Sequence, residues 1–128
     1  FKSVINYLTN AKITLVTSKI EPYGIFVAEA ISSGTPLITT NVGGIPEVIA
    51  LATLNLTTEE KTLFYLWVKI VDPKVESFLS AIREINSNEE SSYRDFLEVI
   101  NKIRPNFSWN DRLKIYGDQV QELIKSKN

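Results

Sequence analysis

The first half of the chain alternates short apolar runs with segments whose apolar spacing suits helices. Residues 13–17 and 36–40 are apolar runs of the length expected for buried strands. The first run is followed by a helical pattern at residues 25–31, and the second by a segment that begins at Pro46, a residue favoured in the first turn of a helix. Residues 1–10 also have a helical pattern. Two consecutive βα units predict a parallel sheet with helices on its faces.

The second half of the chain is mainly helical in pattern. Residues 62–71 are rich in aromatic and β-branched side chains, which predicts a third strand. Amphipathic helices are then predicted at residues 75–85, 93–103 and 109–124. The polar residues 87–92 between the first two are typical of a solvated linker. The predicted fold class is therefore α/β, with a short parallel sheet and C-terminal helices.

Composition excludes several classes of function. The chain has 128 residues, 14 of them basic and 15 acidic, for a net charge of −1, which fits one globular domain and argues against nucleic acid as a partner. The sequence contains no cysteine and no histidine, so thiolate chemistry, disulfides and the usual zinc ligands are excluded. No segment reads as a signal peptide or a membrane span, and a cytoplasmic protein without evident membrane contact is expected.

Two glutamates bracket the loop after the first predicted strand. Glu21 follows this strand and Glu29 lies in the first turns of the next helix, at the carboxyl end of the sheet where open α/β folds bind ligands. Backbone amides at Gly24, Ile25 and Phe26 would suit a phosphate. Carboxylates would accept hydrogen bonds from polyol hydroxyls, so the combination predicts a sugar nucleotide. The alternative is an acidic residue that merely interacts with the helix dipole.

A longer motif contains these residues and resembles a known family. The string EPYGI-x3-EA-x3-GTP begins at residue 21, and TNVGGIPE begins at residue 40. Together they resemble the C-terminal, donor-binding Rossmann lobe of retaining GT-B glycosyltransferases of the E-x7-E type. The strings AKITLVTS at residues 11–18 and FSW at residues 107–109 are weaker matches, and residues 50–71 depart from the family pattern without a readable role.

The resemblance implies a fold, a domain organisation and a set of site residues. The chain would be a partial Rossmann-like, three-layer lobe, a single partial domain over residues 1–128, with βα units and donor motifs in 1–72 and C-terminal helices in 73–128. Glu21 would be catalytic, holding the donor sugar and supporting its oxocarbenium-like transition state, and Glu29 would hold the ribose. The expected donor-binding residues are Glu21, Tyr23, Gly24, Ile25, Phe26, Glu29, Gly43 and Gly44.

Alternatives remain open for several of these residues. Gly43 and Gly44 suit a loop beside the donor, and equally a plain turn before a helix that starts with proline. Tyr65 and Trp67 are expected in a buried strand, and Trp109 in core or interdomain packing, rather than as platforms for a sugar. The resemblance implies no cofactor and no metal, because the nucleoside-diphosphate sugar is itself the donor substrate.

The resemblance also implies parts that this sequence does not contain. An N-terminal acceptor lobe, and the donor-lobe strands whose Arg and Lys neutralise the leaving diphosphate, have no counterpart here, so the chain alone is expected to be inactive. An open sheet edge would favour a homo-oligomer. The alternative function is a non-catalytic sugar-nucleotide-binding or interaction module that assembles with a partner chain. The sugar, the nucleotide and the acceptor stay undetermined.

Overall fold

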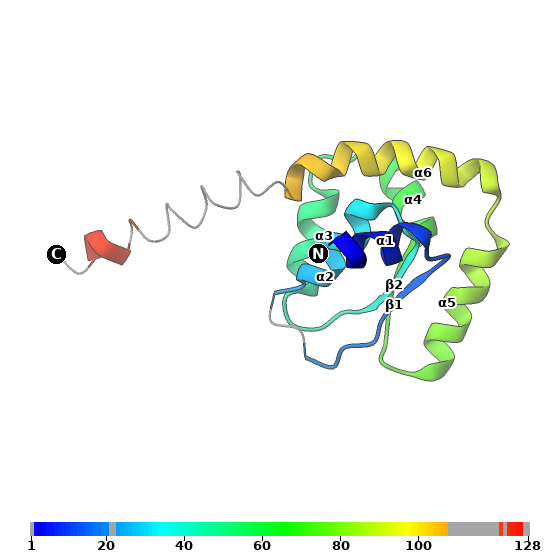
Figure 1. Cartoon of the computed structure of the whole chain (residues 1–128), viewed down its shortest axis with the longest axis horizontal. Helices are drawn as coiled ribbons and strands as arrows, with labels where there is room; N and C mark the ends of the chain where they lie inside the picture. Colours follow the sequence, from blue (N-terminus) through cyan, green and yellow to red (C-terminus); the bar gives the residue numbers. More distant parts are fainter. Residues whose placement is uncertain (1, 21–22, 108–120, 122, 127–128) are drawn as a thin grey trace.

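The computed structural model describes residues 2–20, 23–107, 121 and 123–126. Helices and strands are interspersed as far as residue 71, and helices follow (Figure 1). In chain order the elements are α1 (Lys2–Asn10), β1 (Thr14–Val16), α2 (Ile25–Ser33), β2 (Leu37–Thr40), α3 (Ile45–Thr53), α4 (Thr58–Trp67), β3 (Val68–Val71), α5 (Val75–Ser87), α6 (Glu90–Ile103) and the 3-10 helix η1 (Arg104–Phe107).

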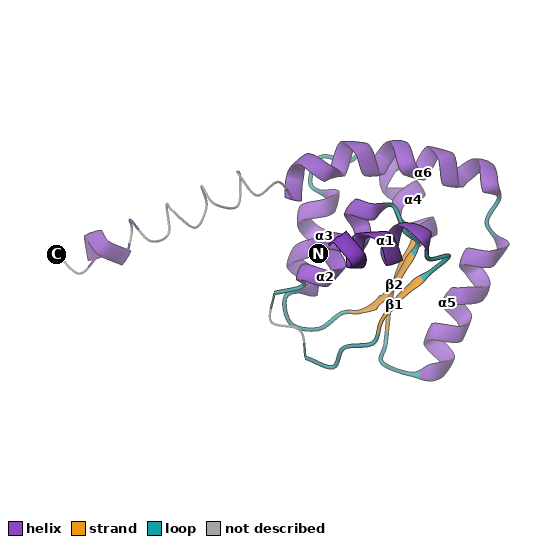
Figure 2. Cartoon of the chain, viewed as in Figure 1, coloured by secondary structure: helices purple, strands orange, loops and turns teal. Residues whose placement is uncertain are grey.

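A parallel sheet of three strands, in the order β1-β2-β3, forms the centre of the described fold (Figure 2). Leu15 pairs with Ile38, and Ile38 with Lys69, so these three side chains share one face of the sheet. Strand β2 is buried along its whole length, as expected for the middle strand of a parallel sheet. The predicted α/β class and its short parallel sheet are confirmed, and the arrangement is that of a partial Rossmann-like lobe.

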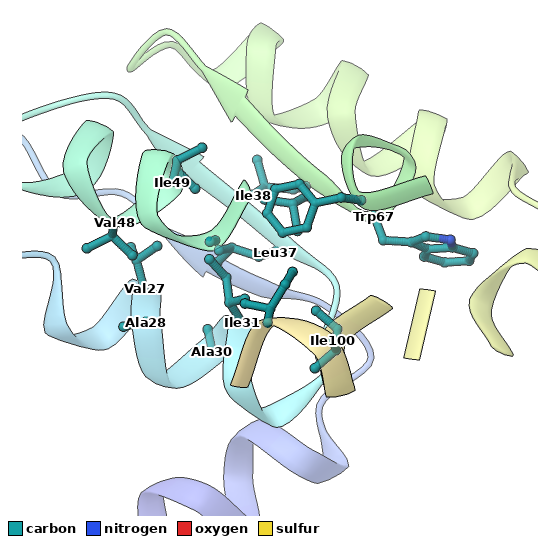
Figure 3. Packing of buried hydrophobic residues seen from close by; sticks show 14 of the residues in the cluster. Val27, Ala28, Ala30, Ile31, Leu37, Ile38, Val48, Ile49, Trp67 and Ile100 are labelled. Atoms are coloured by element: carbon teal, nitrogen blue, oxygen red, sulfur yellow. The ribbon is translucent and has the colours of Figure 1, made fainter. Parts of the chain in front are cut away.

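Helices cover the two faces of the sheet unequally. Helix α5 contacts β3 and β2 and lies on the opposite side of the sheet from α2 and α3 (Figure 1). On the side of α2 and α3, apolar side chains of α2, β2, α3 and α6 pack together, including Ile31, Leu37 and Ile100, which are fully buried (Figure 3). On the α5 side Ile38 is fully buried, but Leu15 on the outer strand is 46% exposed.

Local sequence explains where α2 and α3 begin and end. Helix α2 ends at Gly34, whose φ of 77° lies in the left-handed region that glycine adopts without steric cost. Pro46 lies in the first turn of α3, where its missing N–H is not needed. The place of Pro46 in the first turn of α3 follows the sequence prediction.

The strand predicted at residues 62–71 is correct only for its last four residues. Residues 58–67 form helix α4, which begins with a reciprocal capping box between Thr57 and Glu60. Phe64 and Trp67 are buried three positions apart, the spacing of one helical face, while Tyr65 between them is 39% exposed. The β-propensity of aromatic side chains depends on their context. Here the capping box and the burial of one helical face outweigh it.

The helices of the second half agree with the prediction as far as the structure describes them. Helices α5 and α6 include the predicted segments 75–85 and 93–103. The linker is shorter than predicted, because only residues 88–89 separate the two helices and Ser91 and Ser92 belong to α6. Most of the helix predicted at residues 109–124 lies outside the described residues.

Candidate functional site

The loops after β1 and β2 meet at the carboxyl edge of the sheet. Gly24 precedes α2 with a φ of 65°, and a Cβ atom placed there would lie 2.7 Å from Cγ2 of Val48 and 3.1 Å from the carbonyl oxygen of Gly44. A side chain at position 24 is therefore excluded by both space and backbone conformation. This close approach brings together the two sequence motifs, which are about twenty residues apart in the chain.

The N-terminus of α2 faces this edge without a side-chain cap. Gly24 occupies the N-cap position, and glycine has no side chain that could accept from the first N–H groups of the helix. These groups, at Ile25 and Phe26, have no acceptor within the helix itself. They carry the positive end of the helix dipole, and the arrangement suits an anionic group such as a phosphate.

Glu29 lies one turn beyond Ile25 on the same face of α2. Positions i and i+4 of a helix are neighbours, and Cβ atoms tilt toward the N-terminus, so the Glu29 side chain is expected on the side of the helix start. It is partly exposed, and within the described residues it makes no ion pair or hydrogen bond. A carboxylate without partners can accept hydrogen bonds from the hydroxyls of a ligand.

Apolar side chains surround this part of the loop. Tyr23 is 73%, Ile25 51% and Phe26 39% exposed. Three large apolar side chains exposed within four residues are the kind of cluster that contacts another molecule.

Of the remaining predicted site residues, the structure describes Gly43 and Gly44 but not Glu21. Gly43 has a φ of 56°, which explains why glycine is needed in the turn before α3, and it is exposed. Glu21, the predicted catalytic residue, lies outside the described residues, so its place in the site stays a prediction. The structure therefore brings together Tyr23, Gly24, Ile25, Phe26, Glu29, Gly43 and Gly44 in the two adjoining loops and the start of α2.

One residue at this edge was not among those predicted for the site. Thr40, the last residue of β2, donates a hydrogen bond from its hydroxyl to the carbonyl oxygen of Ser18, 2.6 Å away. The bond connects the last residue of β2 to the first part of the loop that follows β1. The sequence signal that would have found Thr40 is a hydroxyl side chain at the end of an otherwise buried strand, where polar groups are uncommon.

Tyr65 and Trp67 belong to helix α4 and not to these loops. Trp67 is buried in helix α4. Its ring packs edge-on against that of Tyr93, with 5.2 Å between the ring centroids. The expected burial of Trp67 is confirmed, but the strand expected for it is wrong. For Tyr65 both expectations are wrong, because it lies in the helix and is exposed. Trp109 lies outside the described residues.

A surface hollow of about 630 Å³ lies beside the predicted site, between β3 and α5. Asn41, Ser77 and Asp72 are among its lining residues, as are Lys69 and Glu84, which form an ion pair at 3.0 Å. None of the predicted donor-binding residues that the structure describes lines this hollow. The incomplete cover of the sheet on this side explains the hollow without a ligand, so the two loops are the stronger candidate site.

The described residues contain neither a cluster of metal ligands nor a helix suited to span a membrane. No group of three or more Asp or Glu side chains there is arranged to hold a metal ion. Among the described helices, none combines the length and the apolar character that a membrane span requires.

Comparison with known proteins places the chain in a family. None of the curated proteins matches it. Residues 1–103 match the model of the family described as glycosyl transferases group 1. The matched range includes the whole sheet and every described residue of the two loops. Because this match extends over most of the 128 residues, the chain belongs to the group 1 glycosyl transferases.

Proposed function

We propose that the chain forms the donor-binding part of a retaining GT-B glycosyltransferase of the E-x7-E type. The observation that carries this proposal is the contact of Gly24 with Gly44 and Val48, which joins the two motif loops at the carboxyl edge of the sheet. Glu29 lies in α2, one turn after Ile25, and has no partner among the described residues. Family membership supports glycosyl transfer in general, and this geometry supports the role in holding the donor.

In this proposal each part of the junction meets one part of a nucleoside-diphosphate sugar. The open N–H groups of α2 at Ile25 and Phe26 bind the diphosphate, and the Glu29 carboxylate accepts hydrogen bonds from the ribose hydroxyls. Glu21 holds the sugar and stabilises positive charge at its anomeric carbon. The bond from that carbon to the diphosphate oxygen breaks, and its electron pair leaves with the diphosphate. The oxygen of an acceptor hydroxyl bonds to the carbon on the same face of the sugar, and the hydroxyl proton passes to the departing diphosphate.

The first experiment measures donor binding by calorimetry. Wild-type protein is titrated with UDP-glucose, GDP-mannose and ADP-glucose, and the donor that binds is then titrated into Glu29→Gln. This substitution keeps the size of the side chain and removes its charge. We expect Glu29→Gln to weaken binding about tenfold, the size expected when a charged hydrogen-bond acceptor is lost.

Glu98→Gln is the matched control for this experiment. Glu98 is an exposed carboxylate on α6, away from the two loops, and its substitution should leave donor affinity unchanged. The proposal is wrong if the wild-type protein binds none of the three donors, or if Glu29→Gln binds the donor as tightly as wild type does. Donor binding without glycosyl transfer by the full-length protein would favour the alternative, a non-catalytic sugar-nucleotide-binding module.

A further inference from the structure

Thr40 places a hydroxyl group in a fully buried position at the carboxyl edge of the sheet. Its side chain has no exposed surface, and a buried hydroxyl without a hydrogen bond is costly. The partner is the backbone carbonyl of Ser18, at an oxygen–oxygen distance of 2.6 Å, at the short end of the range for hydroxyl donors.

This bond continues the attachment of the chain beyond the end of β1. The pairing of β1 with β2 runs from Thr14–Leu37 to Val16–Thr39 and stops there. Ser18 lies two residues farther along, in the segment that leads from the sheet to the loop before α2. Within the described chain, the bond from Thr40 is the only hydrogen bond made by residues 17–20.

We propose that Thr40 is a positioning residue of the donor-binding site, holding residues 17–20 in place through its bond to the Ser18 carbonyl. This inference rests on the proposed function, since it assumes that the adjoining loops bind a donor. Thr40 does not touch the donor in this proposal. It acts by restricting the segment that enters the site, so that binding does not have to order that segment.

The loss of such a restriction weakens binding in a predictable way. A loop that samples several conformations binds with an affinity reduced by the fraction of time it spends in the competent one. The neighbouring anchor at Gly24 is independent of Thr40, because it depends on packing against Val48 and Gly44. Removing the Thr40 hydroxyl should therefore loosen the entrance to the loop without detaching α2.

The chain offers a close control for this hydroxyl. Thr39, the preceding residue of β2, is equally buried, and its hydroxyl donates to the carbonyl oxygen of Thr40 at 3.0 Å. That bond stays within the strand and does not reach residues 17–20. Thr39→Val and Thr40→Val thus each remove one hydroxyl group from a fully buried position. Only Thr40→Val removes the bond that holds residues 17–20.

The experiment measures donor affinity in wild type, Thr40→Val, Thr40→Ser and Thr39→Val. Valine has nearly the shape of threonine, and serine keeps the hydroxyl. Calorimetry with the tightest of UDP-glucose, GDP-mannose and ADP-glucose is run well below the unfolding midpoint of each variant, so that differences in global stability do not enter. We expect Thr40→Val to bind about tenfold more weakly. Thr40→Ser and Thr39→Val should remain within about twofold of wild type.

A second measurement follows the segment itself without any ligand. Lys19 is exposed and offers a trypsin site inside the tethered segment. Cleavage after Lys19 under native conditions should be several-fold faster in Thr40→Val than in wild type or Thr39→Val, because local opening governs such cleavage.

The outcomes separate this inference from the proposed function. Weaker binding by Thr40→Val with rescue by serine supports both. Normal binding by Thr40→Val, or an equal loss in Thr39→Val, overturns the positioning role and leaves the donor site standing. A wild-type protein that binds none of the three donors overturns the proposed function and this inference with it.

Discussion

Gly24 and Val48 belong to different loop–helix junctions, yet a Cβ atom at Gly24 would lie 2.7 Å from Cγ2 of Val48. We predict that Gly24→Ala destabilises the protein more than Gly34→Ala does. Both positions have a left-handed backbone, which costs an alanine about 1–2 kcal/mol. At Gly34 the added atom meets only the flexible end of Leu97, whereas at Gly24 it also meets the backbone carbonyl of Gly44, which cannot move aside easily. Urea unfolding of the two variants tests this.

A loss of stability in Gly24→Ala no larger than that in Gly34→Ala would contradict this interlocked arrangement of the two loops. The double variant Gly24→Ala/Val48→Ala refines the test. The cost of Gly24→Ala should be smaller in the Val48→Ala background than in wild type but should not vanish, because the contact with the carbonyl of Gly44 persists.

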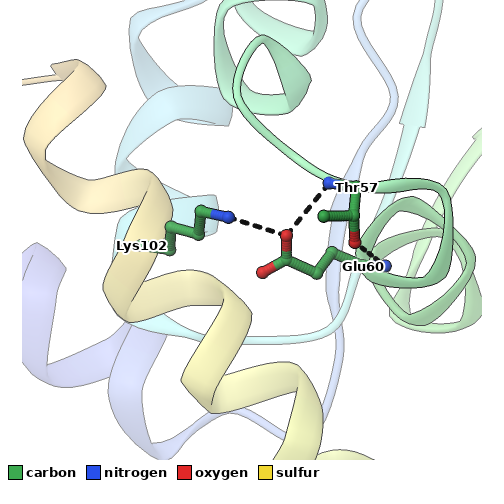
Figure 4. A network of polar contacts seen from close by, with 3 residues as sticks. All are labelled: Thr57, Glu60 and Lys102. Atoms are coloured by element: carbon green, nitrogen blue, oxygen red, sulfur yellow. Dashed lines mark hydrogen bonds and ion pairs between the residues drawn. The ribbon is translucent and has the colours of Figure 1, made fainter.

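Glu60 gives the stability of the protein a dependence on acidic pH. Its Oε1 atom accepts hydrogen bonds from Nζ of Lys102 at 2.7 Å and from the backbone N–H of Thr57 at 2.9 Å (Figure 4). The Lys102 hydrogen bond, helped by that of Thr57, holds the pKa of the Glu60 carboxyl below its ordinary value. A lowered pKa means that the charged form is favoured by folding. The stabilisation is therefore complete above the unfolded-state pKa and is lost as the pH falls through the folded-state pKa.

We predict that wild type is more stable than Glu60→Gln at pH 7, and that the difference shrinks as the pH falls below the ordinary range of glutamate. Urea unfolding at a series of pH values measures it. Glu59→Gln serves as the control, since Glu59 is exposed in the same helical turn and has no ion pair among the described residues. A difference between wild type and Glu60→Gln that is independent of pH would contradict this role of Glu60.

Tyr93 connects helix α6 to the end of α2. Its hydroxyl donates to the carbonyl oxygen of Gly34 at 2.8 Å, and burial raises the pKa of the phenol, so it stays a neutral donor at physiological pH. Tyr93→Phe should lower the free energy of unfolding by about 1 kcal/mol, the usual worth of one hydrogen bond. Tyr65→Phe, at an exposed tyrosine of α4, should change it little. Equal effects of the two substitutions in thermal or urea unfolding would rule out a special role for the Tyr93 hydroxyl.

Self-association through the β1 side of the sheet stays a prediction. Within the described fold, β1 has one hydrogen-bonded neighbour, and Leu15 on it is 46% exposed. Unpaired strand edges with apolar side chains favour pairing with another chain. Light scattering after gel filtration should show a species larger than the monomer, and Leu15→Lys should reduce it. Leu54, which follows α3, is more exposed than Leu15, and Leu54→Lys should leave the larger species unchanged. A monomer at every concentration tested would refute the prediction.

Local signals in the sequence were enough for much of the fold. Gly34 and Pro46 mark the end of α2 and the start of α3 because their backbone preferences act at single positions. The same signals located the two loops of the site. Residues 62–67 were misassigned because aromatic and β-branched side chains suit a buried strand and a buried helix face alike, and here the capping box at Thr57 and the burial of Phe64 and Trp67 decided for the helix.

By itself, then, the sequence determined the βα order, the parallel sheet and the family motifs, since each depends on residues adjacent in the chain. Only the tertiary structure decided that Gly24 packs against Val48, that Thr40 holds the carbonyl of Ser18, and that Glu29 has no partner among the described residues. These relationships join residues about twenty positions apart, or depend on which side chains surround a group. Distances and burial of that kind arise when the helices pack on the sheet, and no local pattern specifies them.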